Sequence, residues 1–178
     1  MTLQAIKKGV ALFFILYSIQ HSSLLRAQSA LYDRFTFEMP FQEALMLLRN
    51  HKKTYQNINL GPGTIYAIRR ASLNRKNNRL YSVTLTSKKT VNLKQASSYL
   101  EKSRSFFEKE GFEVVYADPH WDEPLLRDSQ KPCIRMVQRE KNLLIEMEPI
   151  GQGSIYNIYV TFYNYDWFVA KITGRNPL

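Results

Sequence analysis

Residues 92–117, with the sequence NLKQASSYLEKSRSFFEKEGFEVVYA, decide the predicted fold. Small or apolar residues recur there at the spacing of one helical face, and Tyr99 and Phe106 lie beside that face. The recurring residues are Leu93, Ala96, Leu100, Ser103 and Phe107. Charged side chains occupy the opposite face. The pattern predicts a long helix over residues 93–110 whose apolar face packs on the core.

The two ends of this helix carry signals of their own. Asn92 is a typical N-cap, and Gln95 stands where the second member of a capping box is expected. Gly111 suits the left-handed conformation that often ends a helix. The apolar residues within 112–117 then predict a buried strand directly after the helix.

The rest of the chain predicts strands and a second, shorter helix. Pro40 suits a first helical turn, and residues 41–51 repeat apolar side chains at helical spacing. Alternating segments rich in β-formers are separated by polar turns. These segments are residues 64–73, 79–86, 134–139, 143–148 and 156–163. We therefore expect an α+β fold, with a single antiparallel sheet of about five to seven strands and the long helix packed on one face.

Residues 1–30 are typical of a secretory signal. Lys7 and Lys8 precede eleven apolar residues, and small residues at Ala27 and Ala30 offer two equally suitable cleavage sites. Eleven residues rise only about 16 Å as a helix, roughly half of a hydrocarbon core, so we expect no transmembrane span after signal removal. An uncleaved anchor is the alternative. The prediction is a signal peptide over residues 1–30 and one α+β domain over 31–178, in the periplasm or outside the cell.

The net charge of +10 is distributed unevenly. Residues 44–100 contain eleven bases and no acid, whereas twelve acids and ten bases follow from Glu101 onward. This asymmetry favours an anionic partner for the first half, such as a lipid headgroup or an acidic glycan of the cell envelope. A charge run also simply solvates a surface, and no nucleic-acid motif is present. The polyanion-binding candidates are Arg69, Arg70, Arg75, Lys76, Arg79, Lys88 and Lys89.

Aromatic residues concentrate near the C-terminus. Residues 155–168 hold four tyrosines besides phenylalanines and a tryptophan. Tyr159, Tyr163 and Trp167 are candidates for an interface with an envelope protein, because amphipathic rings are enriched at such contacts. The same rings would also suit a sugar-stacking surface, or packing beneath the N-terminal segment or the loop at 118–132.

The motifs of common enzyme classes are missing from the sequence. There is no G-x-S-x-G elbow, phosphate-binding Walker loop, H-E-x-x-H or C-x-x-C. His120, Asp122 and Glu123 are the one cluster that could hold a metal or exchange protons, although a solvated acidic loop explains them more simply. The single cysteine, Cys133, allows no intramolecular disulfide.

These observations predict an exported, non-enzymatic binding protein of unknown ligand, which engages an anionic partner through a basic hairpin formed by the segments 64–73 and 79–86. We expect no catalytic residue, bound metal or cofactor. The alternative is a small hydrolase or metal-dependent enzyme that uses the loop containing His120, Asp122 and Glu123.

Overall fold

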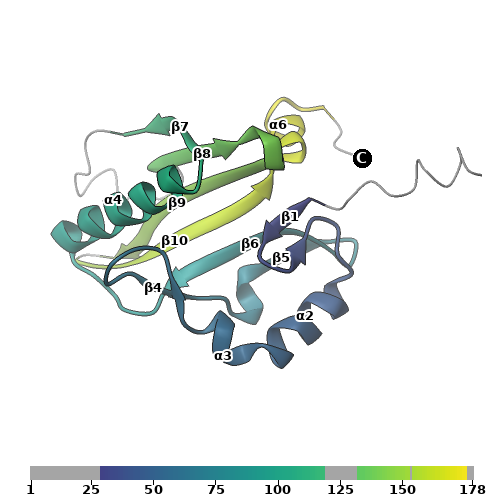
Figure 1. Ribbon diagram of the computed structural model, residues 1–178, viewed down its shortest axis with the longest axis horizontal. Coiled ribbons are helices and arrows are strands. Elements are labelled where there is room, and N and C mark those ends of the chain that lie inside the picture. The colour runs from purple at the N-terminus through teal and green to yellow at the C-terminus, as the bar shows by residue number, and fades with distance from the viewer. Residues whose placement is uncertain (1–28, 119–131, 153, 176–178) are drawn as a thin grey trace, which may run out of the picture.

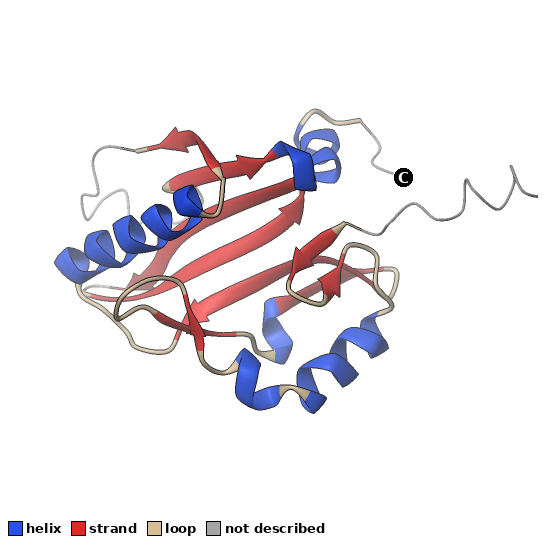
Figure 2. Cartoon of the chain, viewed as in Figure 1, coloured by secondary structure: helices blue, strands red, loops and turns tan. Residues whose placement is uncertain are grey.

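The computed structural model describes residues 29–118, 132–152 and 154–175. These residues form a twisted antiparallel sheet with helices against it (Figure 1). The predicted α+β class is confirmed: one long helix packs on the main sheet, and a shorter helix lies near the N-terminus (Figure 2). The main sheet has eight strands, because short strands join its margin beside the predicted ones.

The longest strands lie at the centre of this sheet. Its order is β3-β4-β6-β10-β9-β8-β7, and β5 also pairs with β6. The bounds are Ile58–Asn59 for β3, Ile65–Ala67 for β4, Leu73–Lys76 for β5, Arg79–Ser87 for β6, Glu113–Ala117 for β7, Ile134–Gln138 for β8, Leu143–Gln152 for β9 and Ile155–Asn164 for β10. The predicted meander of three consecutive strands is β8-β9-β10, and its last strand joins the first half of the sheet by pairing with β6.

Helix α4, Leu93–Lys109, is the predicted long helix. Its N-terminus has the predicted capping box: the Gln95 amide N–H donates to Asn92 Oδ1 at 2.9 Å, and the Asn92 N–H donates to Gln95 Oε1 at 3.0 Å. Gly111 ends the helix with φ 86°, in the left-handed region that favours glycine. Leu100 and Phe107 are buried as α4 packs on β9 and β10.

The strand after α4 differs from the prediction of a buried strand. β7 pairs only with β8, at one edge of the sheet, and Val115 and Tyr116 are 50% and 41% exposed. An edge strand has a neighbour on one side only, so apolar composition alone does not bury it.

The two faces of the central strands differ in polarity, as the alternation in β6 predicts. Val83, Phe162 and Ile145 lie opposite one another on adjacent strands and face the core. On the other face, Thr84 and Thr161 share a hydrogen bond of 3.1 Å between their hydroxyls. We call this second, polar face the outer face.

The N-terminal segment adds a second covering to the core face. A two-stranded ribbon, β1 (Ala30–Tyr32) and β2 (Phe35–Thr36), precedes helix α2 (Phe41–Asn50). The Tyr32 ring contacts Phe162 at 5.0 Å between centroids, and Phe107 of α4 contacts the same ring at 5.7 Å. The ribbon and α4 therefore lie on the same side of the sheet.

Two segments differ from what the sequence indicates. The polar residues after α2 begin with a short helix, α3 (Lys52–Tyr55), which the sequence pattern did not predict. The strand predicted over residues 64–73 is instead β4, a one-turn 3₁₀ helix η1 (Arg70–Ser72) and the first residue of β5. This break turns the chain away from β6 after Ala67, and it provides one wall of the cavity described below.

A C-terminal helix was not predicted. Helix α6, Tyr165–Ile172, begins directly after β10, and Asn164 caps it by accepting a 2.9 Å hydrogen bond from the Trp167 N–H. Phe168 packs with Val137 and Leu144, so α6 covers one end of the outer face. Among the described residues, no helix is long and apolar enough to cross a membrane.

Candidate functional site

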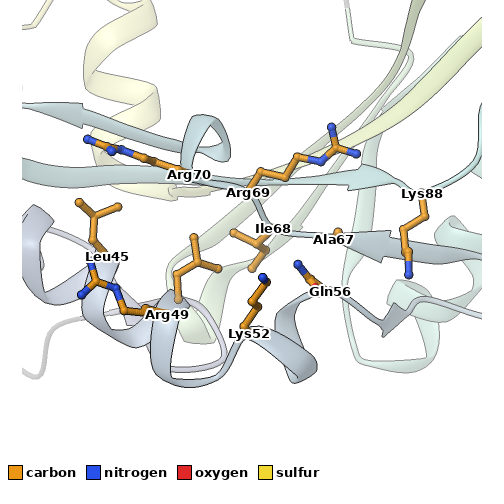
Figure 3. Close-up of a pocket in the computed structure, with 10 residues that line it drawn as sticks. Leu45, Arg49, Lys52, Gln56, Ala67, Ile68, Arg69, Arg70 and Lys88 are labelled. Carbon is orange, nitrogen blue, oxygen red and sulfur yellow. The ribbon is translucent and has the colours of Figure 1, made fainter.

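The most distinctive site is a basic cavity between α2, α3 and the wall formed by residues 67–70. Its volume is about 590 Å³ (Figure 3). Five of its lining side chains are cationic and four are aliphatic, and none of the described lining residues is an acid. They are Leu45, Leu48, Arg49, Lys52, Gln56, Ala67, Ile68, Arg69, Arg70 and Lys88. We call this site the first cavity.

One wall of this cavity is formed by side chains that lie at helical spacing. Leu48 and Arg49 lie three and four positions after Leu45, and Lys52 lies four and three positions after them, so the four residues share one face even though the chain passes from α2 into α3. The face begins apolar and ends basic. It therefore presents a hydrocarbon surface with cations at its margin.

A backbone hydrogen bond fixes the opposite wall. The Ile68 N–H donates to the Tyr55 carbonyl at 2.8 Å, which ties the strand end to α3. Tyr55 itself is buried, and its hydroxyl donates to an Asp33 carboxylate oxygen at 2.7 Å. Beyond Ile68, Arg69 and Arg70 point toward opposite ends of the cavity (Figure 3).

The cations of the first cavity are exposed, and most of them have no bonding partner among the described residues. Within the described part of the chain, the side chains of Arg49, Lys52, Arg69 and Arg70 form no ion pair and no hydrogen bond. Lys88 is different, because its Nζ donates to Asn57 Oδ1 at 2.9 Å. Four guanidinium or ammonium groups are thus available to an anionic ligand.

The seven predicted polyanion-binding residues do not form one surface. Arg69, Arg70 and Lys88 line the first cavity, whereas Arg75 and Lys76 line a second one. The remaining two, Arg79 and Lys89, line neither. Arg79 donates from Nη1 to the Glu38 carbonyl at 3.0 Å, and Lys89 is exposed.

The second cavity lies between the β5-β6 hairpin and α6, and its volume is about 750 Å³. It combines four bases with three aromatic rings, and no acid is among its described lining residues. They are Asn74, Arg75, Lys76, Tyr81, Ser82, Tyr163, Trp167, Lys171, Gly174 and Arg175. The hairpin bases and two of the interface candidates, which the sequence suggested for separate functions, therefore share one cavity.

The rings of the second cavity are engaged with one another. Trp167 stacks on Tyr163 at 6.2 Å between centroids and contacts Tyr81 at 5.3 Å and Phe37 at 6.3 Å. Phe37 belongs to the N-terminal segment, so packing beneath that segment applies to Trp167. Tyr159, the third interface candidate, lies on the outer face opposite Glu148 and lines neither cavity.

Tyr163 and Cys133 both have a raised pKa, with burial as the largest cause. Burial, together with the nearby Glu146 carboxylate, raises the pKa of Tyr163 above its ordinary value. Burial raises the pKa of Cys133 to about 12, with smaller contributions from Glu148 and Asp118. The Cys133 thiol is only 2% exposed, so the folded chain offers a small buried apolar group there rather than a reactive thiolate.

Several residues of the two cavities were not singled out from the sequence. Arg49 and Lys52 belong to the acid-free stretch, and their helical spacing after Leu45 and Leu48 is a signal that could have identified them. Lys171 and Arg175 join the second cavity only because α6 turns back toward the hairpin.

The enzyme hypothesis falls on residues that the structure does not describe. His120, Asp122 and Glu123 lie outside the described residues, so their proposed role stays a prediction. Within residues 29–118, 132–152 and 154–175, no group of three or more metal-ligating side chains is found.

Comparison with protein families, with curated proteins and with solved structures finds no match to this chain. Function is therefore inferred from the chemistry of the two cavities.

Proposed function

We propose that this chain is an exported binding protein that holds an anionic partner in the first cavity. The observation that carries the proposal is the set of five cations around one concave site with no acid among its described lining residues. A cleft of one charge sign with low-dielectric walls concentrates the field and attracts ligands of opposite sign. Four of these cations keep their hydrogen-bonding capacity for a ligand.

The side chains around the cavity favour binding over catalysis. Its described lining contains arginine, lysine, glutamine and aliphatic residues, and it includes no serine, threonine, cysteine, histidine or carboxylate. Arginine stays protonated in proteins and donates hydrogen bonds without accepting a proton. Such a lining suits recognition of carboxylate, phosphate or sulfate oxygens.

Two hydrogen bonds of Ser29 favour one of the two predicted signal-cleavage sites. The Phe37 N–H donates to the Ser29 carbonyl at 2.9 Å, and Asn164 Nδ2 donates to Ser29 Oγ at 2.7 Å. Cleavage after Ala27 preserves both bonds and the whole of β1, whereas cleavage after Ala30 removes both bonds and the first residue of β1. We expect the mass of the mature protein, secreted from its native host, to correspond to a chain that begins at Gln28.

Two lysine pairs provide a matched test of the anion site. Lys52 and Lys88 line the first cavity, while their sequence neighbours Lys53 and Lys89 are exposed outside it. The double variants Lys52→Ser/Lys88→Ser and Lys53→Ser/Lys89→Ser have the same net charge. We expect the first variant to elute from immobilised heparin at clearly lower salt than the second. Equal elution would mean that heparin senses only overall charge, and it would contradict the proposal.

A further inference from the structure

We infer that the ligand of the first cavity is a single anionic amphiphile, with one acidic headgroup and a hydrocarbon chain. This inference rests on the proposed function and goes further by naming the ligand class. The cations would bind the headgroup, and the aliphatic lining would receive the chain.

The aliphatic part of the cavity lining is the observation that separates an amphiphile from a polyanion. Leu45 and Leu48 are half-buried, and Ala67 and Ile68 are 6% and 2% exposed. Figure 3 shows Leu45 and Ile68 on facing walls, with the Lys52 stem between α3 and the strand end. A sulfated or uronic glycan would pair with the cations and leave the exposed parts of Leu45 and Leu48 in water. An alkyl chain would cover them and release that water.

The shape of the site favours one small molecule over a membrane surface. A bilayer is broad and engages flat basic patches, whereas this site is a recess of about 590 Å³. That volume falls within the range of roughly 300 to 1,000 Å³ in which proteins hold small ligands. The aliphatic stems of Arg49 and Lys52 extend the apolar lining up to the charged rim.

The chain length of the ligand provides a test that needs no mutation. Methyl phosphate, butyl phosphate and octyl phosphate carry the same headgroup, and n-octanol carries the chain without charge. We expect affinity, measured by calorimetry below the micellar concentration, to rise by about fourfold for each methylene that becomes buried. With three to four of its seven additional methylenes buried, octyl phosphate should bind about a hundredfold more tightly than methyl phosphate, and octanol should bind more weakly than octyl phosphate. Equal affinity for the three phosphates would overturn the amphiphile inference and leave the anion site standing.

Two leucines of α2 provide the matched variants. Leu48 lines the cavity, whereas Leu47 is half-buried on the same helix outside it. In variants that melt well above the assay temperature, Leu48→Asn should weaken octyl phosphate binding about tenfold and spare methyl phosphate, while Leu47→Asn changes neither. An unchanged affinity of Leu48→Asn for octyl phosphate would contradict the inference.

The lysine pairs distinguish failure of the inference from failure of the proposed function. Lys52→Ser/Lys88→Ser should weaken all three phosphates by about tenfold, because charge-assisted hydrogen bonds are lost, and Lys53→Ser/Lys89→Ser should weaken none. If both pairs bind every phosphate equally, the anion site itself is wrong, and the amphiphile inference is wrong with it.

Discussion

The two cavities have similar charge but use their cations differently. In the first cavity, Arg69 and Arg70 contact no ring and pair with no acid among the described residues. In the second, Lys171 Nζ lies 5.1 Å from the Trp167 ring centroid, and the Arg75 guanidinium lies 4.5 Å from that of Phe41. A cation on an aromatic face already has a favourable partner within the fold.

The comparison shows that a count of bases does not measure the capacity to bind anions. The second cavity is the larger, but its rings contact one another and two of its cations lie on rings. We therefore interpret it mainly as a packing cluster that fixes α6 against the hairpin. The cations of the first cavity remain available to a ligand, whereas two cations of the second cavity already lie on aromatic rings.

The substitution with the largest expected effect unfolds the domain and therefore abolishes both cavities. Leu100 is fully buried on the inner face of α4, and Leu100→Asp would place a carboxylate in the core without a partner. We expect the free energy of unfolding to fall by more than about 4 kcal/mol, enough to unfold the domain. The exposed neighbour change Lys102→Asp is the control. An unchanged melting profile of Leu100→Asp by circular dichroism would show that the helix register is wrong.

A smaller change should affect the second cavity alone. Trp167→Ala removes the ring that contacts Phe37, Tyr81 and Tyr163, and we expect a loss of about 2 kcal/mol in urea unfolding. Binding of octyl phosphate to the first cavity should stay the same in the folded variant. Ile172→Ala, at a position 62% exposed on the same helix, should have little effect on either measurement. A loss of ligand binding in Trp167→Ala would mean that the cavities are coupled.

One lysine from each cavity tests the comparison most directly. Lys171→Gln should lower the free energy of unfolding by about 0.5 kcal/mol, because it loses the contact with the Trp167 ring. Lys52→Gln should not lower it, since Lys52 has no such partner within the described part of the chain. Equal stability losses in the two variants would remove the distinction between engaged and available cations.

The smallest effect concerns Glu148, which lies on the outer face and lines neither cavity. Burial, and then the neighbouring Glu146, raise the pKa of Glu148 above the ordinary carboxyl value. Because the pKa of Glu148 is higher in the folded than in the unfolded state, ionisation of this carboxyl lowers the free energy of unfolding above the folded-state pKa. Below the unfolded-state pKa the carboxyl is protonated in both states and has no such effect. Glu148→Gln should therefore be slightly more stable than the wild type at neutral pH, with the difference disappearing as the pH falls through the carboxyl range. A stability difference between Glu148→Gln and the wild type that stays constant across this pH range in urea titrations would contradict this prediction.

The sequence predicted the parts of the fold that depend on local periodicity. The helix at 93–110, its Asn92–Gln95 capping box and the final meander are confirmed because each is specified by residues close together in the chain. Helix α6 was missed because Tyr165 and Trp167 continue the aromatic composition of β10. Its signal was Asn164, a good N-cap three residues before Trp167.

The sequence predicted the positive charge of the candidate site but not which basic residues line the same cavity. Arg69 and Arg70 were named, but whether a basic residue meets α2 or α6 depends on the break after β4 and on the turn into α6. These are tertiary features that a list of basic residues does not contain.

The pairing of β6 with β10 has a consequence for how the chain folds. Thr84 and Thr161 face each other at the centre of the sheet, although 77 positions separate them in the chain. Such distant pairing makes loop closure slow, and the core cannot close until the last strand has emerged from the ribosome. A chain truncated before β10 would leave β6 and β9 with unpaired edges, which are templates for aggregation. Late completion also suits a protein that must stay unfolded until it has crossed a membrane, as the proposed export requires.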